Sequence, residues 1–356
     1  MGIKRKLRKL FKEEPKKSPE QIKKEAAKKA EREANYDAIM KATGWTKDEA
    51  VANFKEAKER TGCRLDEYVN YKFWDMDEET QNSWCVVAVT KGMTKTFNTD
   101  PAFVNLLRSK AKTNEFLKDY IGRGYCVNTE IDRESFRKLF INSERVFYKP
   151  MSSSWGRGAQ AFTVNEETID AVYDEVVKLP EGVVEEYVKQ HDEMNRLSPT
   201  AVNTLRLVTV SSKTKPVLED GSSADIVYAM LKMGGATGCV DNLHGGGLGA
   251  GVDLETGKLI TPAVNDFAVP HNYHPVTGTK IEGFQIPFYK ESKELAMKAI
   301  EGLGLEGYLG WDIAITNKGP VIIEINTHPG VTLLQLPYMP QKKGMKHIYD
   351  KYLIEK

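Results

Sequence analysis

The first part of the chain has the residue pattern of helices. From Ser18 to about Lys72 the sequence is charged, rich in Lys, Glu and Ala, and nearly free of Gly and Pro, which predicts mostly helical structure. Thr46 followed three residues later by Glu49 resembles a capping box, and Gly62 follows a basic turn and is a typical helix end. We expect these helices to cover or dock on the rest of the chain rather than to form a site.

Shorter apolar runs follow, and they predict a mixture of helices and strands. We expect a helical stretch at 98–122, a helix at 166–178, and strands at 125–127, 145–150, 158–164, 182–188 and 204–210. From Val217 onward short strands and glycine-rich turns continue, followed by a helix at about 292–302, a hairpin, and a terminal helix at 346–354. Because strands and helices do not alternate strictly, the pattern predicts the α+β class rather than a doubly wound sheet.

The hairpin combines apolar strands with opposed acids. Residues 310–315 and 321–326 are apolar runs joined by a short turn. If Lys318 is the apex, Asp312 lies opposite Glu324, and Asn326 points to the same face as Glu324. Opposed like charges are destabilising, so we expect a cation between them, and an all-oxygen set suits magnesium bridging the phosphates of a nucleotide. The alternative is a solvated polar face, with a bulge near Gly319 that shifts the pairing.

Length and composition limit the class of protein. At 356 residues the chain is expected to contain two or more packed units. It is 28% charged and 40% hydrophobic, as soluble globular proteins are, and its net charge of +1 gives no argument for nucleic-acid binding. No apolar stretch is long enough to span a bilayer. The cysteines are far apart, which indicates a reduced, cytoplasmic protein; they are Cys63, Cys85, Cys126 and Cys239.

The N-terminus is a basic amphipathic segment. Between residues 3 and 12, six Lys or Arg residues surround four apolar residues at helical spacing. Such a helix suits peripheral contact with the anionic inner face of a membrane. The alternative is a solvated helix end that docks on the rest of the chain.

Two further segments have residues suited to a nucleotide. Lys149 ends a strand and precedes a loop of small residues and glycines, 151–158, whose amides and lysine suit a phosphate. Glu185 ends another apolar strand, where an acid can accept the amine of adenine; the amide of Val188 suits the purine ring, and Asp192 or Glu193 suits the ribose. The alternatives are a plain hairpin turn and a strand end that enters solvent.

Other candidates concern the substrate. Arg206 lies within an apolar strand, and a buried guanidinium requires an anion, which is either a carboxylate or a bound phosphate. The glycine-rich segment 241–249 is too flexible for a core element and is expected to close over a ligand. The histidines lack the spacing of zinc ligands, so each is interpreted as structural or facing the substrate.

Taken in order, these motifs resemble the ATP-grasp superfamily. The resemblance is carried by Tyr148-Lys149-Pro150 with its glycine-rich loop, by Glu185-Glu186-Tyr187-Val188, and by Asp312 with Glu324-Ile325-Asn326-Thr327-His328-Pro329-Gly330. Gln190-His191, Asn203-Thr204-Leu205-Arg206, Asp241-Asn242-Leu243-His244 and Gly310-Trp311-Asp312 resemble the sugar-transfer-associated branch. The match extends from about residue 98 to residue 337.

The resemblance implies a fold and a set of binding residues. It implies two α+β subdomains that grip ATP, after a helical N-terminal extension: an extension at 1–80, a small α/β segment at 81–145, a lid subdomain at 146–212 and a C-terminal subdomain with the metal site at 213–356. The residues implied for ATP are Lys110, Lys112, Lys149, Ser153, Gly156, Gly158, Glu185, Glu186, Val188, Asp192 and Glu193, with Lys110 and Lys112 competing for one role. Asp312, Glu324 and Asn326 match magnesium ligands.

The chain departs from the superfamily at one position. Amino-acid ligases of the superfamily tend to carry an arginine two residues before the first metal acid, where this chain has Gly310. Arg206 or Arg157 is expected to substitute for it. Arg206 is therefore expected to act in catalysis with Lys149, and Asn242, His244 and His328 are candidates for substrate contact.

The function implied is an ATP- and magnesium-dependent carboxylate–amine ligase that forms an acyl phosphate. The branch name suggests a role in cell-surface polysaccharide biosynthesis, with a small-molecule or glycan-linked carboxylate and an amine as substrates. The alternatives are a phosphotransferase of the same fold and a non-catalytic membrane-associated scaffold.

Overall fold

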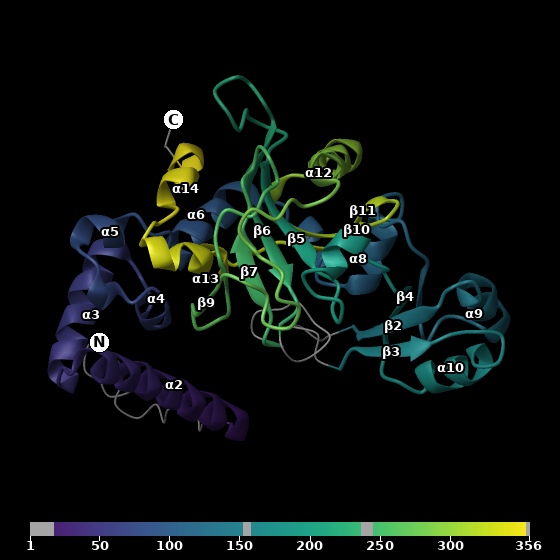
Figure 1. Cartoon of the computed structure of the whole chain (residues 1–356), viewed down its shortest axis with the longest axis horizontal. Helices are drawn as coiled ribbons and strands as arrows, with labels where there is room; N and C mark the ends of the chain where they lie inside the picture. The colour runs from purple at the N-terminus through teal and green to yellow at the C-terminus, as the bar shows by residue number, and fades with distance from the viewer. Residues whose placement is uncertain (1–17, 152–157, 236–244, 354–356) are drawn as a thin grey trace, which may run out of the picture.

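The chain forms two β-sheets with helices packed around them (Figure 1). The computed structural model describes residues 18–151, 158–235 and 245–353. A four-stranded sheet has the order β1-β4-β2-β3, and a seven-stranded sheet has the order β11-β10-β5-β6-β7-β8-β9. Neighbouring strands are antiparallel throughout both sheets. The mixed helices and strands agree with the predicted α+β class.

The strands of each sheet have the following bounds. The smaller sheet contains β1 (Tyr125–Val127), β2 (Arg145–Pro150), β3 (Gln160–Thr163) and β4 (Gly182–Glu186). The larger sheet contains β5 (Thr204–Ser211), β6 (Ala224–Met233), β7 (Leu248–Gly251), β8 (Ala263–Val264), β9 (Pro270–His271), β10 (Gly307–Thr316) and β11 (Gly319–Asn326).

The helices precede, separate and follow these strands. They are α2 (Pro19–Thr43), α3 (Lys47–Thr61), α4 (Leu65–Asn70), η1 (Phe73–Asp75), α5 (Glu78–Asn82), α6 (Val87–Phe97), α7 (Pro101–Leu106), α8 (Lys110–Phe116), α9 (Arg133–Phe140), α10 (Ile169–Val176), α11 (Asp192–Asn195), α12 (Tyr289–Leu303), α13 (Val331–Gln335), η3 (Leu336–Gln341) and α14 (Lys346–Leu353).

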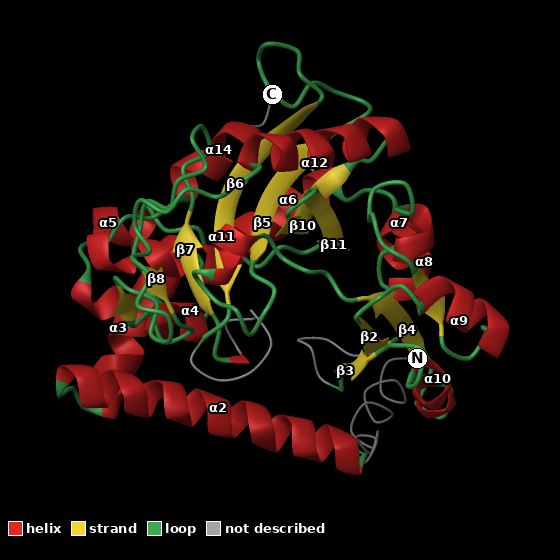
Figure 2. Cartoon of the chain, turned by 45° about the vertical axis from the view of Figure 1, so that its right-hand side comes forward, coloured by secondary structure: helices red, strands yellow, loops and turns green. Residues whose placement is uncertain are grey.

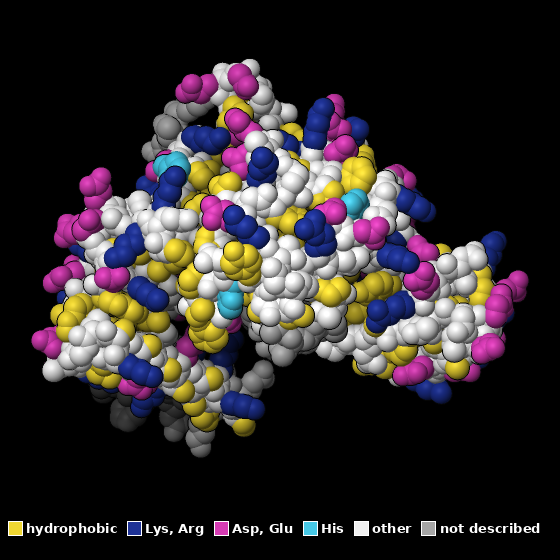
Figure 3. Space-filling view, viewed as in Figure 1, with side chains coloured by type: hydrophobic (Ala, Val, Ile, Leu, Met, Phe, Trp, Pro, Cys, Tyr) yellow, Lys and Arg dark blue, Asp and Glu magenta, His cyan; other side chains and the backbone are white. Residues whose placement is uncertain are grey.

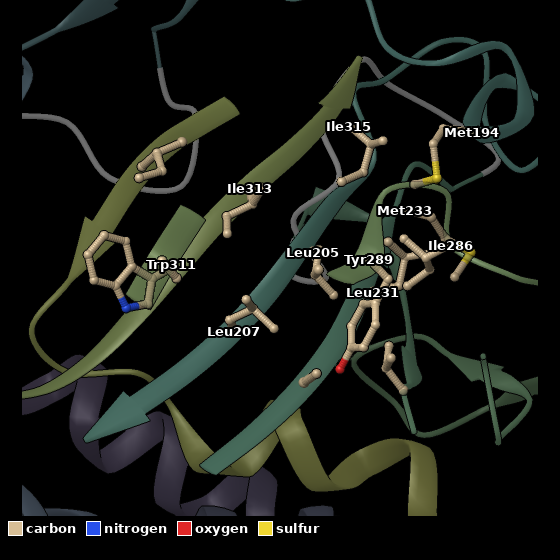
Figure 4. Close-up of a cluster of buried hydrophobic side chains, with 14 of the residues drawn as sticks. Met194, Leu205, Leu207, Leu231, Met233, Ile286, Tyr289, Trp311, Ile313 and Ile315 are labelled. Atoms are coloured by element: carbon tan, nitrogen blue, oxygen red, sulfur yellow. The ribbon is translucent and has the colours of Figure 1, made fainter. Parts of the chain in front are cut away.

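One face of the larger sheet is apolar along its length. Leu205, Leu207, Trp311, Ile313 and Ile315 project from β5 and β10 into a single buried cluster (Figure 4). Helix α12 lies across this face (Figure 2), and its alanines belong to the same cluster. Because successive side chains of a strand point to opposite faces, the residues between these apolar positions are left for the other face.

The other face changes from apolar to charged along the strands. At one end, Val208, Tyr228 and Tyr308 are buried against α6 and α14. At the other end, Asp312 lies directly opposite Arg206 across the β10–β5 pair. The same face is therefore core at one end and a polar surface at the other.

The smaller sheet has a similar division. Val146, Tyr148 and Val184 pack against α9 and α10 in a separate core. Lys149 and Glu185 alternate with these residues along β2 and β4 and therefore point to the opposite face. Each sheet thus buries one face on helices and presents charged groups on part of the other.

The N-terminal helices dock on the edge of the larger sheet. Tyr36 of α2 and Tyr68 of α4 are buried in one cluster with Val264 of β8 and with Leu336 and Met339 of η3. This agrees with the predicted docking role. The predicted capping box of Thr46 with Glu49 and the helix end at Gly62 are also confirmed. The basic segment at residues 1–17 lies outside the described residues.

Most of the predicted elements are present, with two differences. The helical stretch expected at 98–122 is two short helices, α7 and α8. The expectation of only short strands after Val217 is wrong for β6, which has ten residues and is central in the larger sheet. In addition, β5 pairs with β10 and β6 in the larger sheet, although the predicted lid unit at 146–212 includes it.

On the face seen in Figure 3, Lys and Arg side chains lie interspersed with Asp and Glu. None of the helices in the described ranges combines the length and apolar character needed to cross a membrane. Cys63 and Cys85 are buried free thiols, and Cys239 lies outside the described residues.

Gln335 joins the N-terminal helices to the C-terminal part of the chain, so its replacement should destabilise the fold. Its buried amide donates to the Cys85 carbonyl at 2.6 Å and accepts from the Cys85 and Met345 amides at 2.9 and 3.1 Å. Gln335→Leu leaves these buried groups unsatisfied, so we expect the free energy of unfolding in urea to fall by at least about 2 kcal/mol. The matched change at the exposed Gln341 should cost less than about 0.5 kcal/mol. Equal losses would contradict this account.

Candidate functional site

The β10–β11 hairpin brings two acids together. Asp312 and Glu324 are directly paired in the register, as the sequence predicted, but for a different reason. The turn contains two residues, Asn317 and Lys318, because Thr316 pairs with Gly319. A bulge at Ile323 then shifts the register by one residue, so that Glu324 returns to a position opposite Asp312. The bulge lies beside the acids rather than near Gly319.

Two cations hold the Asp312 carboxylate. Arg206 donates from Nε to Oδ1 at 2.6 Å and from Nη2 to Oδ2 at 2.8 Å, and Lys232 Nζ donates to Oδ2 at 3.1 Å. The Asp312 side chain is 4% exposed. Burial favours the neutral acid, but the charges of Arg206 and Lys232 outweigh it and hold the pKa of Asp312 well below its usual range. Asp312 is therefore ionised at neutral pH. The anion predicted for Arg206 is this carboxylate.

Glu324 is in a different electrostatic environment. Its side chain is exposed, and Asn326 donates to its Oε1 at 3.1 Å. Desolvation, and then the charge of Asp312 with which it shares a hydrogen bond, raise the pKa of Glu324. Asp312 and Glu324 thus share a proton, and a metal cation in place of this proton would be held by the same two carboxyl groups.

The donors of this cluster fit a hard divalent ion. Glu324 contributes carboxylate oxygens, and the amide nitrogen of Asn326 is used toward Glu324, which leaves its carbonyl oxygen for a ligand. A carboxylate has about four lone-pair sites, and Arg206 and Lys232 make three bonds to Asp312. No cluster of three or more His, Cys, Asp or Glu side chains suited to a metal occurs within the described ranges. The fit therefore depends on Asn326 as the third ligand.

Gly310 makes room for Arg206. A Cβ at position 310 would lie 2.9 Å from Cβ of Pro329 and 3.3 Å from Cδ of Arg206. A larger side chain would therefore require Pro329 or Arg206 to shift. This explains the departure noted in the sequence, because the place beside the first acid is occupied by an arginine from the neighbouring strand β5.

A second buried carboxylate lies on the smaller sheet. Glu185 accepts from Lys149 Nζ at 2.7 Å, from Arg123 Nε at 3.1 Å and from Asn114 Nδ2 at 2.7 Å. Burial would raise the pKa of Glu185, but the charges of Arg123 and Lys149 outweigh it and hold the pKa well below its usual range. Lys149 and Glu185, both predicted for the nucleotide, are thus held against each other.

Arg123 connects the two sheets. Besides contacting Glu185, it donates from Nη1 to the Ile322 carbonyl at 2.6 Å and from Nη2 to the Ile323 carbonyl at 3.1 Å. These carbonyls lie at the bulge that places Glu324 opposite Asp312. Sequence reasoning missed Arg123, because the surrounding Gly122 and Gly124 were interpreted as the end of a helical stretch. The Arg123 guanidinium therefore holds Glu185 in a fixed position relative to Asp312 and Glu324.

Of the two competing lysines, Lys110 faces the site. Its Nζ donates to the Pro150 carbonyl at 2.9 Å, and desolvation lowers its pKa while the charges of Glu324 and Glu185 oppose that shift. Lys112 is exposed. Lys110 therefore lies near both Glu324 of the larger sheet and Glu185 of the smaller sheet. Its Nζ contacts Pro150, the residue that precedes the loop 151–158.

The remaining nucleotide candidates differ in position. Glu186 accepts from the Gly124 amide at 2.6 Å and from Ser143 Oγ at 2.9 Å, so its carboxylate is already used on the other face of β4. Gly158 has a φ of 74°, a left-handed conformation that suits glycine. Ser153, Gly156, Arg157, Asn242 and His244 lie outside the described residues.

The segment after β4 crosses from the smaller to the larger sheet. Val188 lies in this connection, and Gln190 then bridges to Thr316 at the tip of β10. Glu193 is paired with Arg196 at 2.6 Å. Asp192 is exposed, and the described residues provide its side chain with no hydrogen-bond or ion-pair partner. Asp192 is therefore the better placed of the two ribose candidates.

Comparison with known proteins identifies relatives of this arrangement. The sequence pattern of the family described as sugar-transfer associated ATP-grasp matches residues 123–350. The chain is 39% identical over 67 residues to D-alanine--D-alanine ligase B of Clostridium perfringens, which covers 18% of this chain and 22% of that protein. The chain thus matches about a fifth of that relative.

Solved structures show weaker likeness. The D-alanine--D-alanine ligase of Bacillus anthracis is 13% identical with a TM-score of 0.38, over 70% of this chain and 68% of that one. The ATP-grasp ligase PsnB is 14% identical with a TM-score of 0.39, over 72% and 64%. At these TM-scores the likeness carries no argument of its own. The family match confirms the resemblance found in the sequence, although it begins at residue 123 rather than at about 98.

The space beside Gly310 gives a prediction for stability. Gly310→Ala inserts a methyl group between Pro329 and Arg206, and overpacking of this kind should lower the free energy of unfolding in urea by about 1–3 kcal/mol. Gly92→Ala is the control, because it lies within α6 and its new Cβ would make ordinary contacts of 3.5 Å. The control should be neutral or stabilising by about 0.5–1 kcal/mol. A harmless Gly310→Ala would show that Arg206 does not depend on this space.

Proposed function

Since this chain belongs to the sugar-transfer associated ATP-grasp family, we propose that it is an ATP- and magnesium-dependent ligase that joins a carboxylate to an amine. The observation that carries the proposal is the pairing of Asp312 with Glu324 on a sheet face that also bears Arg206 and Lys232. Acids and cations interleaved in this way suit the phosphates of a nucleotide together with a divalent ion.

Different residues are proposed to bind the phosphates, the adenine and the ribose of the nucleotide. Lys149, Lys110 and the amides near Gly158 hold the phosphates, and Glu185 accepts the amine of adenine while Val188 contacts its ring. Asp192 takes the ribose hydroxyls. Lys110 and Lys149 lie close enough for their charges to interact, which supports a shared phosphate site. Glu186 acts by positioning the strand, because its carboxylate is bonded within the protein.

The residues around Asp312 and Glu324 on the larger sheet are proposed to bind the terminal phosphate. Asp312, Glu324 and Asn326 would hold magnesium, which would supply positive charge to offset that of the phosphates. Arg206 stays on Asp312 and faces the phosphate as it moves to the acceptor carboxylate, and Lys149 neutralises charge on the leaving diphosphate. The amine then attacks the acyl phosphate and releases inorganic phosphate. Positioning and charge suffice for these steps, so no side-chain nucleophile is needed.

The acceptor is proposed to belong to cell-surface glycan metabolism. This rests on the description of the family and on the charged and hydroxyl side chains among the residues that line the pocket beside residues 328–331. Asn242, His244 and His328 are proposed to contact the acceptor. Contact of residues 1–17 with a membrane surface would bring the protein to a lipid-linked acceptor.

Trapping of the intermediate tests the reaction class. With Mg-ATP and an accepted carboxylate, neutral hydroxylamine should give a hydroxamate in amounts equal to the ADP released, because it captures an acyl phosphate. Hydroxamate is measured as its iron complex and ADP by chromatography. A stable phosphorylated product that forms without an amine would identify a phosphotransferase instead. Wild-type protein that binds no Mg-ATP would favour the scaffold alternative.

Glu324→Gln should separate stability from function. The raised pKa of Glu324 means that its ionisation destabilises the fold, so wild-type stability falls as pH rises through that pKa, which lies above 4.5. The variant should therefore be more stable than wild type at pH 7, with the difference vanishing toward pH 4, while Mg-dependent ATP turnover falls at least about 100-fold. Glu301→Gln on the exposed surface of α12 should change neither property. A Glu324→Gln protein that turns over ATP normally would refute the assignment.

A further inference from the structure

A pocket lies where the N-terminal helices meet the segment that follows Asn326. It has a volume of about 390 Å³, within the size of small-molecule sites. Its walls come from α4 and the residue before it, from α6, and from residues 328–331. The N-terminal helices therefore contribute to a cavity, in addition to their docking role.

The pocket offers acceptors for hydroxyl groups. Thr90 Oγ1 donates to the Val87 carbonyl at 3.2 Å and Thr94 Oγ1 donates to the Thr90 carbonyl at 2.9 Å. Since each hydroxyl hydrogen is used within α6, the oxygens that line the pocket can accept hydrogen bonds from a ligand. Asn70 adds an amide for which the described residues provide no hydrogen-bond partner.

The pocket also carries one uncompensated positive charge. Arg64 is paired with Asp66 at 2.5 Å, so these two charges offset each other. Lys91 of α6 is exposed, and within the described ranges no acid lies within ion-pair distance of it. His328 also lines the pocket. A ligand with an anionic group would thus meet an available cation at Lys91.

Pro329 is shared by this pocket and by the cluster on the larger sheet. It lines the pocket, and it also packs against Gly310 so closely that a Cβ there would lie 2.9 Å away. Gly310 lies directly beside Arg206, which binds Asp312. Asn98 fixes the segment by donating to the Thr327 carbonyl at 2.6 Å and accepting from the Tyr308 amide at 2.6 Å. The pocket therefore adjoins the place where the terminal phosphate is proposed to react.

From this arrangement we infer that the pocket binds the acceptor, and that the acceptor is a hydroxyl-rich small molecule that carries a second anionic group besides the carboxylate to be phosphorylated, as a phosphorylated sugar acid does. The threonine oxygens accept its hydroxyl groups, Lys91 binds the second anionic group, and the wall at Pro329 directs the reacting carboxylate toward Arg206. This inference rests on the proposed function and specifies its substrate class. A second pocket, lined by Asp225, Lys293 and Lys351, is a weaker candidate because Lys351 already pairs with Asp225 at 3.0 Å.

Isothermal titration of the full chain with Mg-ADP tests the inference. The probes are glucuronate, glucose 1-phosphate, glucose and D-alanine. We expect at least one of the two anionic sugars to bind at least about tenfold more tightly than glucose, as a charge-assisted hydrogen bond predicts, and D-alanine to bind more weakly than that sugar. Which anionic sugar binds shows whether the group held by Lys91 is a carboxylate or a phosphate.

Lys91→Gln should weaken that binding about tenfold and leave Mg-ADP binding unchanged. Lys95→Gln is the matched control on the same helix, because Lys95 does not line the pocket. Equal effects of the two variants, equal binding of glucose and the anionic sugars, or tighter binding of D-alanine would overturn the inference. If wild type binds Mg-ADP but no sugar, the inference fails and the proposed nucleotide site stands, whereas failure to bind Mg-ADP would refute the proposed function itself.

Discussion

The candidate site depends on two carboxylates that face each other across a hairpin. Like charges in register are unfavourable, and Asp312 and Glu324 coexist because Arg206 and Lys232 fix the first as an anion while the second retains its proton more readily. The unfavourable electrostatic energy therefore falls on the ionised form of Glu324. Such a local cost, with no benefit to the fold, is typical of a site that becomes favourable only when a cation binds.

A second constraint holds the two sheets in one arrangement. Arg123 is 4% exposed and contacts both Glu185 on the smaller sheet and the carbonyls of the bulge on the larger one. The bulge therefore has two roles, since it sets the register of Glu324 and provides acceptors for Arg123. Lys149 is held by the same Glu185. Groups that serve opposite ends of a nucleotide are thus connected through a single guanidinium.

Part of this arrangement could be predicted from the sequence. Opposed acids at Asp312 and Glu324 were expected, and the register confirms them. The two-residue turn alone would pair Asp312 with Ile323. The bulge at Ile323 shifts the register by one residue and pairs Asp312 with Glu324. A bulge leaves little trace in the residue pattern, because Ile323 is as apolar as its neighbours. The length of β6 was also missed, since nothing in its sequence shows that it lies between β5 and β7 in the middle of the larger sheet.

Other features depend on contacts between distant parts of the chain. Arg123 lies 62 positions before Glu185 and about 200 before the bulge carbonyls that it contacts, so no local pattern could reveal its role. The absence of arginine at Gly310 was visible in the sequence, whereas its explanation required the position of Arg206 on the neighbouring strand. The pocket at Lys91 lies between α4, which the sequence indicated only as part of a docking element, and α6, which was not predicted as a helix.

The central claim is that Asp312, Glu324 and Asn326 together bind a divalent ion with the nucleotide. Crystals grown with ADP and Mn²⁺ in place of Mg²⁺ test it directly, because manganese gives an anomalous diffraction signal. The account predicts an anomalous peak within bonding distance of oxygens from all three side chains and from the nucleotide phosphates. A bound nucleotide with its manganese elsewhere, or with these three side chains pointing away from the peak, would contradict it.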